Sequence, residues 1–157
     1  MTEEQQMQAF IRHYRKQSGK NIWDMHDVAA LAERMGWKMP KPMTPRELLA
    51  KKFSKAARTE TRVDPETGER YRVNHAFTDA TGQMTLWVDI DEAPRTLMHK
   101  SVTNGREQVV GDLVQLTTDV EHWNRQNPNE DPLQIPLDFG PDVEWRKNGG
   151  DAGEPAA

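Results

Sequence analysis

Residues 44–62, TPRELLAKKFSKAARTETR, form the stretch that says most about the fold. Thr44 and Glu47 have the spacing of a capping box, in which each side chain accepts a hydrogen bond from the other residue's backbone N–H. Pro45 stands at the first helical position, where its missing N–H has no cost. The stretch therefore predicts a helix that begins directly after Thr44.

This predicted helix has an apolar side and a basic side. At about 100° per residue, Leu49, Phe53 and Ala56 fall within about 60° of one another. The basic residues of the opposite side follow at intervals of four, three and four: Lys51, Lys55, Arg58 and Arg62. We expect the apolar side to pack on a core and the basic side to face solvent.

Two further helices are expected upstream. The segment from Thr2 to Gln17 repeats apolar residues at helical spacing and ends before Gly19. A second, shorter helix follows Asp24, a favoured N-cap residue, and ends near Gly36, where a left-handed backbone favours glycine. The connector KMPKPM, residues 38–43, contains two prolines and cannot be helical throughout.

A small antiparallel sheet is expected downstream. The turn sequences DPETG at 64–68 and DATG at 79–82 separate segments in which apolar and polar residues alternate, at 70–77 and 83–90. We predict three short antiparallel strands that begin near Thr61.

The order of these elements resembles a winged helix-turn-helix domain. Residues 27–36, DVAALAERMG, resemble the first half of that motif, with Ala32 at the helix crossing and Gly36 at the turn. The resemblance covers about residues 5–92 and concerns the fold alone. It implies an α+β fold with a winged-helix-like core of three helices plus a small antiparallel sheet. The connector at 38–43 is longer than the tight turn of the simplest members.

A long C-terminal helix is expected after Pro94, from about Arg95 to Asn127, weakened at Asn104-Gly105. Its apolar residues recur at intervals of four, three, four and three: Val109, Leu113, Leu116, Val120 and Trp123. This seam, at 109–123, fits either packing on the chain's own core or a homodimer. The predicted organisation is a winged-helix-like domain at 1–93, a helical segment at 94–127, and an acidic, Pro- and Gly-rich tail at 128–157 whose end is disordered.

Charge is distributed unevenly along the chain. The net charge is −4, yet residues 12–75 contain 15 Lys or Arg against 8 Asp or Glu, and the rest contains 6 against 17. Such asymmetry favours one face that meets an anionic partner.

The sequence therefore predicts non-catalytic binding of double-stranded DNA, as by a bacterial transcriptional regulator or an accessory factor of a mobile-element or defence locus. A major groove admits one helix with phosphates on both sides, and Arg70 and Arg72 of the neighbouring strand would touch the backbone or the minor groove. Asn74 could reach a base edge. The predicted DNA-binding residues are Arg46, Lys51, Lys52, Lys55, Arg58, Arg62, Arg70, Arg72 and Asn74. Predicted core residues are Phe10, Leu31, Leu49, Phe53, Leu86 and Val88.

The sequence leaves two other classes of function open, a metal-dependent nuclease and a protein-interaction adaptor. In a metal-dependent nuclease, Asp89, Asp91 and Glu92 with His75 or His99 could bind a divalent cation, although strand-end carboxylates more often prevent edge pairing. The five histidines are scattered and no catalytic motif occurs, so no catalytic residue, metal or cofactor is expected.

The third class is a protein-interaction adaptor, through the acidic C-terminal portion. Residues 134–139, QIPLDF, resemble the glutamine-led peptide by which bacterial replication and repair proteins dock on the sliding clamp. The resemblance would make Gln134, Leu137 and Phe139 the partner-binding residues. The alternative is a tail that packs on its own domain.

The expected location is the cytoplasm. No apolar run approaches 18 residues, the N-terminus is polar and acidic, and cysteine is absent. No membrane partner is expected.

Overall fold

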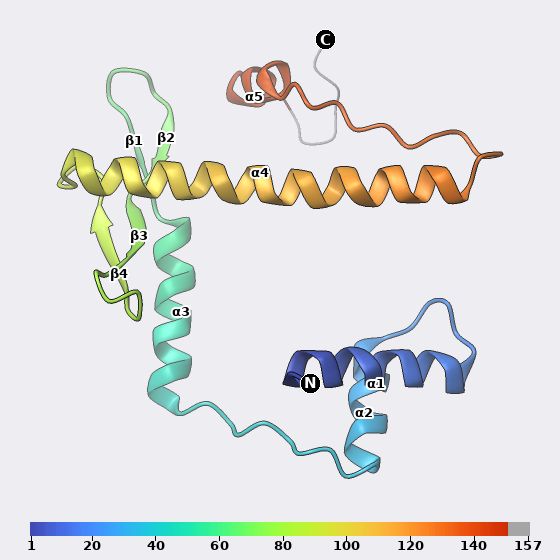
Figure 1. The fold of residues 1–157 in the computed structure, drawn as a ribbon. Helices are drawn as coiled ribbons and strands as arrows, with labels where there is room; N and C mark the ends of the chain where they lie inside the picture. The colour runs from blue at the N-terminus through green and yellow to red at the C-terminus, as the bar shows by residue number, and fades with distance from the viewer. Residues whose placement is uncertain (151–157) are drawn as a thin grey trace. The chain divides into compact units, whose positions relative to one another are not determined.

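The computed structural model describes residues 1–150, and Figure 1 draws their helices and strands. By their contacts, residues fall into two units, Met1–Ser54 and Lys55 to the end of the chain. The boundary lies within helix α3 (Pro45–Thr59). The boundaries predicted after residues 93 and 127 stay predictions.

The first unit contains the two predicted N-terminal helices, α1 (Glu3–Ser18) and α2 (Met25–Arg34). Asp24 caps α2, and its side chain accepts a hydrogen bond from the His26 backbone N–H at 2.8 Å. Gly36 has a φ of 81°, in the left-handed region predicted for it. Thr2 and Gln5 form a capping box at the start of α1, which was not predicted.

A small apolar contact holds α1 against α2. Tyr14 of α1 and Val28 of α2 are buried, and the Phe10 ring meets the Trp37 ring edge-on, with centroids 5.1 Å apart. Phe10 and Leu31, both predicted core residues, are half-buried.

Helix α3 begins with the capping box that the sequence predicts. The Thr44 backbone N–H donates to Glu47 Oε2 at 2.8 Å, and the Glu47 N–H donates to Thr44 Oγ1 at 3.2 Å. The expectation that its apolar side is core is wrong, since Leu49 is 54 % and Phe53 66 % exposed. Helical periodicity establishes that a helix has an apolar side but does not supply the surface that covers it.

The chain forms four strands in this region, one more than predicted, and they pair in two separate antiparallel sheets. β1 (Thr61–Val63) pairs with β2 (Arg70–Arg72), and β3 (Asn74–Thr78) pairs with β4 (Thr85–Asp89). The predicted continuous strand at 70–77 is therefore divided between two partners.

Val73 is the point at which the strand changes partner. Its N–H donates to the Glu60 carbonyl at 3.1 Å, and its carbonyl accepts from the Ile90 N–H at 2.8 Å. The side chain is 2 % exposed and is the most completely buried large side chain among residues 1–150. Val88 is half-buried, whereas Leu86, also predicted as core, is exposed.

Helix α4 (Arg95–Gln126) is the predicted long helix, and it runs unbroken through Asn104 and Gly105, where the sequence predicts a local weakening. One helical glycine costs only about 1 kcal/mol, which the neighbouring turns can offset. The helix packs on β3, where Lys100 Nζ donates to the Thr78 carbonyl at 3.3 Å. His75 lies between Ser101 Oγ, 3.4 Å from Nδ1, and the Arg72 carbonyl, 3.2 Å from Nε2.

An extended segment follows α4 and leads to a short helix, α5 (Gly140–Lys147), which was not predicted. Lys147 Nζ lies 3.2 Å from Glu69 Oε1 in the loop between β1 and β2. The predicted disorder of the chain's end falls mainly on residues 151–157, outside the described residues.

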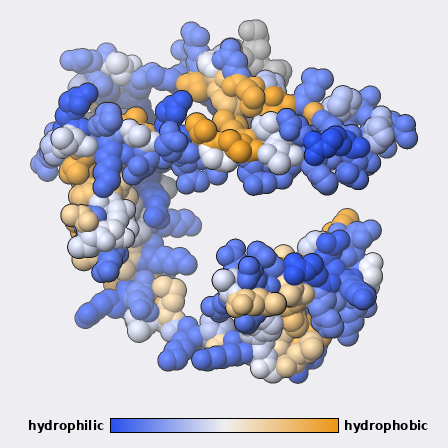
Figure 2. Space-filling view, viewed as in Figure 1, coloured by the Kyte–Doolittle hydropathy of each residue, from blue (hydrophilic) through white to orange (hydrophobic). Residues whose placement is uncertain are grey.

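Large apolar side chains remain exposed along α4. Val109 is 54 % and Leu116 47 % exposed, and Figure 2 shows apolar residues gathered over the middle of this helix and the segment beside it. They belong to the predicted 109–123 seam, which is thus only partly covered within one chain.

The fold is α+β, as predicted: three helices, two small antiparallel sheets, a long helix and a short C-terminal helix. Three helices followed by small antiparallel strands are compatible with a winged-helix arrangement. Within residues 1–150, no helix combines the length and apolar character that crossing a bilayer requires.

Candidate nucleic-acid interface

The basic side of α3 is the first part of the candidate interface. Lys51, Lys55 and Arg58 lie within about 60° of one another around the helix axis, opposite Leu49 and Phe53. All three are exposed, and none forms an ion pair with another residue of the described chain. Three cations that no carboxylate neutralises can each contact a phosphate.

Two other predicted residues of α3 lie off this line. Arg46 projects toward the apolar side, and Lys52 lies between the two sides. Both are exposed. They widen the positive region without extending the row formed by Lys51, Lys55 and Arg58.

The end of α3 is fixed to the β3–β4 hairpin by two side chains. The Arg58 guanidinium lies 5.4 Å from the centre of the Trp87 ring, in a cation–π contact. The Asn74 amide donates to the Ala57 carbonyl at 3.1 Å and to Glu60 Oε2 at 2.7 Å. Both amide hydrogens of Asn74 thus have acceptors inside the chain, so the predicted contact with a base edge has no free donor here.

The structure corrects the predicted position of Arg62. Helix α3 ends at Thr59, and Arg62 lies in β1 rather than on the basic side of the helix. Its guanidinium donates to both carboxylate oxygens of Asp89, at 3.0 and 2.6 Å, and to Asp91 Oδ2 at 2.5 Å. The charge of Arg62 is used inside the chain.

The contacts of Arg62 shift the pKa values of the groups around it. Hydrogen bonds from the guanidinium, and then from the Asp91 backbone N–H, lower the pKa of Asp89 below its usual 3.8. The carboxylates in turn raise the pKa of Arg62. The Tyr71 hydroxyl donates to Asp91 at 2.9 Å, and this bond raises the pKa of Tyr71. The network ties β1 and β2 to the end of β4.

The β1–β2 register separates two faces of this hairpin. Arg62 lies opposite Tyr71, so both project from one face, while Arg70 and Arg72 project from the other. Both arginines are exposed and free of ion pairs within the described chain. This second face of β2 matches the predicted basic strand.

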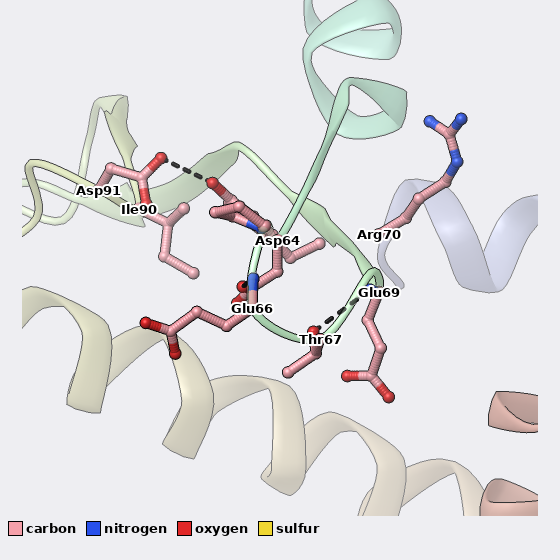
Figure 3. Close-up of a pocket in the computed structure, with 9 residues that line it drawn as sticks. Asp64, Glu66, Thr67, Glu69, Arg70, Ile90 and Asp91 are labelled. Atoms are coloured by element: carbon pink, nitrogen blue, oxygen red, sulfur yellow. Dashed lines mark hydrogen bonds between the residues drawn. The ribbon is translucent and has the colours of Figure 1, made fainter.

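The loop that joins β1 to β2 is acidic. An open hollow of about 550 Å³ beside it is lined by Asp64, Glu66, Glu69 and Asp91, among others. In Figure 3, the Arg70 side chain points away from Glu66 and Glu69. The loop would therefore repel a phosphate, whereas the arginine face of β2 would attract one.

The carboxylates considered for a metal site are otherwise engaged. Asp89 and Asp91 share the Arg62 guanidinium, a positive group where a bound cation would have to stand. Among residues 1–150, no group of three or more His, Asp or Glu side chains is placed to hold a metal ion.

The residues predicted to bind a partner protein lie on the extended segment between α4 and α5. The Asn124 side chain anchors this segment, since Oδ1 accepts from the Leu133 N–H at 2.9 Å and Nδ2 donates to the Leu133 carbonyl at 3.0 Å. Gln134 is exposed, Leu137 is 58 % exposed beside α4, and Phe139 is partly exposed. The segment contacts its own unit and leaves Leu137 largely open.

Two aromatic residues that position basic ones were not predicted from the sequence. Trp87 lies beneath Arg58, and Tyr71 lies beside Arg62 in the same carboxylate network. Strand alternation marked both as strand residues but carried no signal for the particular arginine that each would meet.

Comparison with known proteins identifies no relative: no family model, no curated protein sequence and no solved structure matches the chain.

Proposed function

We propose that this protein binds double-stranded DNA without catalysing a reaction on it, as a bacterial transcriptional regulator or an accessory factor of a mobile-element or defence locus. The proposed interface consists of Lys51, Lys55 and Arg58 on α3 with Arg70 and Arg72 on β2. The observation that carries the proposal is the exposed row on α3, whose cations have no carboxylate partner among residues 1–150.

The physical reason is counterion release. Duplex DNA holds a dense layer of counterions, and each protein cation that contacts a phosphate releases one of them. A helix that presents cations on its outer side can contact phosphates on both sides of a major groove. Arg62, which is paired with Asp89 and Asp91, is no longer part of the proposed interface.

The direct test is fluorescence anisotropy of a labelled mixed-sequence duplex at low salt. We expect Lys51→Glu with Lys55→Glu to abolish binding, because reversing two charges replaces attraction with repulsion, while the circular dichroism spectrum is unchanged. The control is Arg106→Glu with Lys147→Glu, which makes the same charge change at two cations already paired with Glu107 and Glu69. Equal loss in both variants, or no binding by the unaltered protein, would refute the proposal.

A second copy of the chain is the partner we propose for the 109–123 seam. Val109 and Leu116 are seven residues apart and exposed, and Val102 and Trp123 continue the same interval on either side. Apolar residues at seven-residue intervals favour a second helix that coils around the first. A dimer would also present two DNA-binding surfaces.

The alternative function is that of an adaptor which docks through the segment at 134–139. Its supporting observation is that Gln134 and Leu137 are exposed on an extended backbone. A pull-down with the sliding clamp, repeated with Gln134→Ala, tests this alternative. Capture that is lost in the variant would favour the adaptor, and absence of capture would remove it.

A further inference from the structure

A second group of cations lies in the first unit, at the C-terminal end of α1. Arg12, Arg15 and Lys16 are three and four residues apart and so share one side of the helix. Gly19, with a φ of 69°, ends the helix in the left-handed conformation and turns the chain, and Lys20 follows it. None of these was included in the predicted DNA-binding set.

These residues surround an open hollow of about 360 Å³, the α1-end pocket. Its lining consists of Arg12, Arg15, Lys16, Gly19, Lys20 and Asn21. Among the residues that the structure describes, the lining contains four cations and the Asn21 amide and no carboxylate. A phosphate group has five heavy atoms and needs the space of only a few water molecules, about 30 Å³ each in the liquid.

The cations of this pocket are available to a ligand. None of the four forms an ion pair with another residue of the described chain. Arg15 is also held in place, because its guanidinium lies 4.6 Å from the centre of the Trp23 ring. A guanidinium stacked on an aromatic ring keeps its N–H edges free to donate to an anion.

Compensation of the helix dipole does not account for this much charge. The C-terminus of a helix carries only about half a negative charge, which one cation is enough to offset. Four cations leave a large excess. An oxyanion with two or three acceptor oxygens is the ligand that several converging Arg and Lys side chains bind best.

We propose that the α1-end pocket binds a phosphate group. The phosphate could come from the backbone of bound DNA or from a free phosphate ion, and both share this chemistry. Assigning it to DNA rests on the proposed function, whereas binding of phosphate by the pocket does not.

The test is nuclear magnetic resonance of the full chain, titrated with inorganic phosphate against sodium chloride of equal ionic strength. We expect phosphate to shift the backbone amides of Gly19 and Asn21 and the indole N–H of Trp23. The chemical shift of the Gly68 amide should not change, since this left-handed glycine lies in the β1–β2 loop. Equal shifts with chloride, or none with phosphate or DNA, would overturn the proposal.

A pair of variants locates the site. Arg12→Gln with Lys16→Gln should weaken phosphate binding by at least about tenfold, because two charge-assisted contacts are lost. Lys38→Gln with Lys41→Gln is the matched control, since these cations line a different hollow that also contains Glu3. All four residues are exposed, so both variants should fold as the unaltered protein does. Phosphate shifts that persist in the first variant would overturn the proposal.

The same variants on DNA distinguish the two sources of phosphate. If the group belongs to the DNA backbone, duplex DNA shifts the same amides, and the first variant lowers the salt slope of binding by about 2. If phosphate binds and DNA leaves these amides unchanged, the pocket binds free phosphate, which still supports the proposal. If the chain does not bind DNA at all, the proposed function fails and the phosphate titration alone decides on the pocket.

Discussion

Replacing Lys51 and Lys55 with glutamine should reduce the dependence of DNA binding on salt. The proposed interface has five cations, so the logarithm of the association constant should fall with the logarithm of salt concentration at a slope of about −4.5. The double variant retains three of them, and its slope should be about −2.7. Between 50 and 200 mM salt, affinity should fall about 500-fold for the unaltered protein and about 40-fold for the variant.

The assay is anisotropy of a labelled duplex at four or more salt concentrations in that range, with the protein concentration varied at each. Slope is more informative than affinity at one salt concentration, since it counts released ions and depends little on other effects of a substitution. The control is Arg106→Gln with Lys147→Gln, which changes net charge equally at cations paired with Glu107 and Glu69. Its slope should equal that of the unaltered protein.

Three results would refute this reasoning. A variant slope equal to the original would mean that Lys51 and Lys55 do not contact phosphates. Equal reductions in the variant and in the control would mean that net charge, and not the row on α3, governs binding. A slope near zero for the unaltered protein would contradict the proposed interface as a whole.

Three further predictions concern stability and assembly. Val73→Ala should lower the free energy of unfolding by about 2 kcal/mol in urea titrations, because two buried methyl groups are lost. The same change at the exposed Val63 should lower it by less than about 0.5 kcal/mol. Equal losses at the two positions would contradict the core position of Val73. Arg62 lowers the folded-state pKa of Asp89 below its usual value of 3.8. The ion pair between them therefore stabilises the fold at pH values above 3.8, and this stabilisation is lost as the pH falls through the lowered pKa. Asp89→Asn should therefore lower the free energy of unfolding, measured in urea titrations, by a constant amount from neutral pH to about 5, and by less in stronger acid. A destabilisation that grew in acid would contradict this. Leu116→Asp should raise the dimer dissociation constant, measured by sedimentation velocity, at least about a hundredfold, because two apolar contacts are lost per dimer. If the unaltered protein is monomeric, the dimer is refuted.

Part of the candidate site could be predicted because it depends on one helix. The spacing of Lys51, Lys55 and Arg58 places them on one side of any regular helix, whatever surrounds it. Arg62 could not be placed in the same way, since the spacing continues past the point where the helix ends. The Thr59 hydroxyl donates to the Ala56 carbonyl at 3.0 Å there, and the chain changes to β1 two residues later.

Short-range sequence patterns were sufficient to predict three local features: the capping box at Thr44, the left-handed turn at Gly36, and the start of α4 after Pro94. Each depends on residues a few positions apart, whose preferences act before any long-range contact forms. Three other features became visible only in the folded chain: the strand changes partner at Val73, Asp89 neutralises Arg62, and the apolar side of α3 stays exposed. Those outcomes depend on segments distant in sequence meeting in space, which no local pattern encodes.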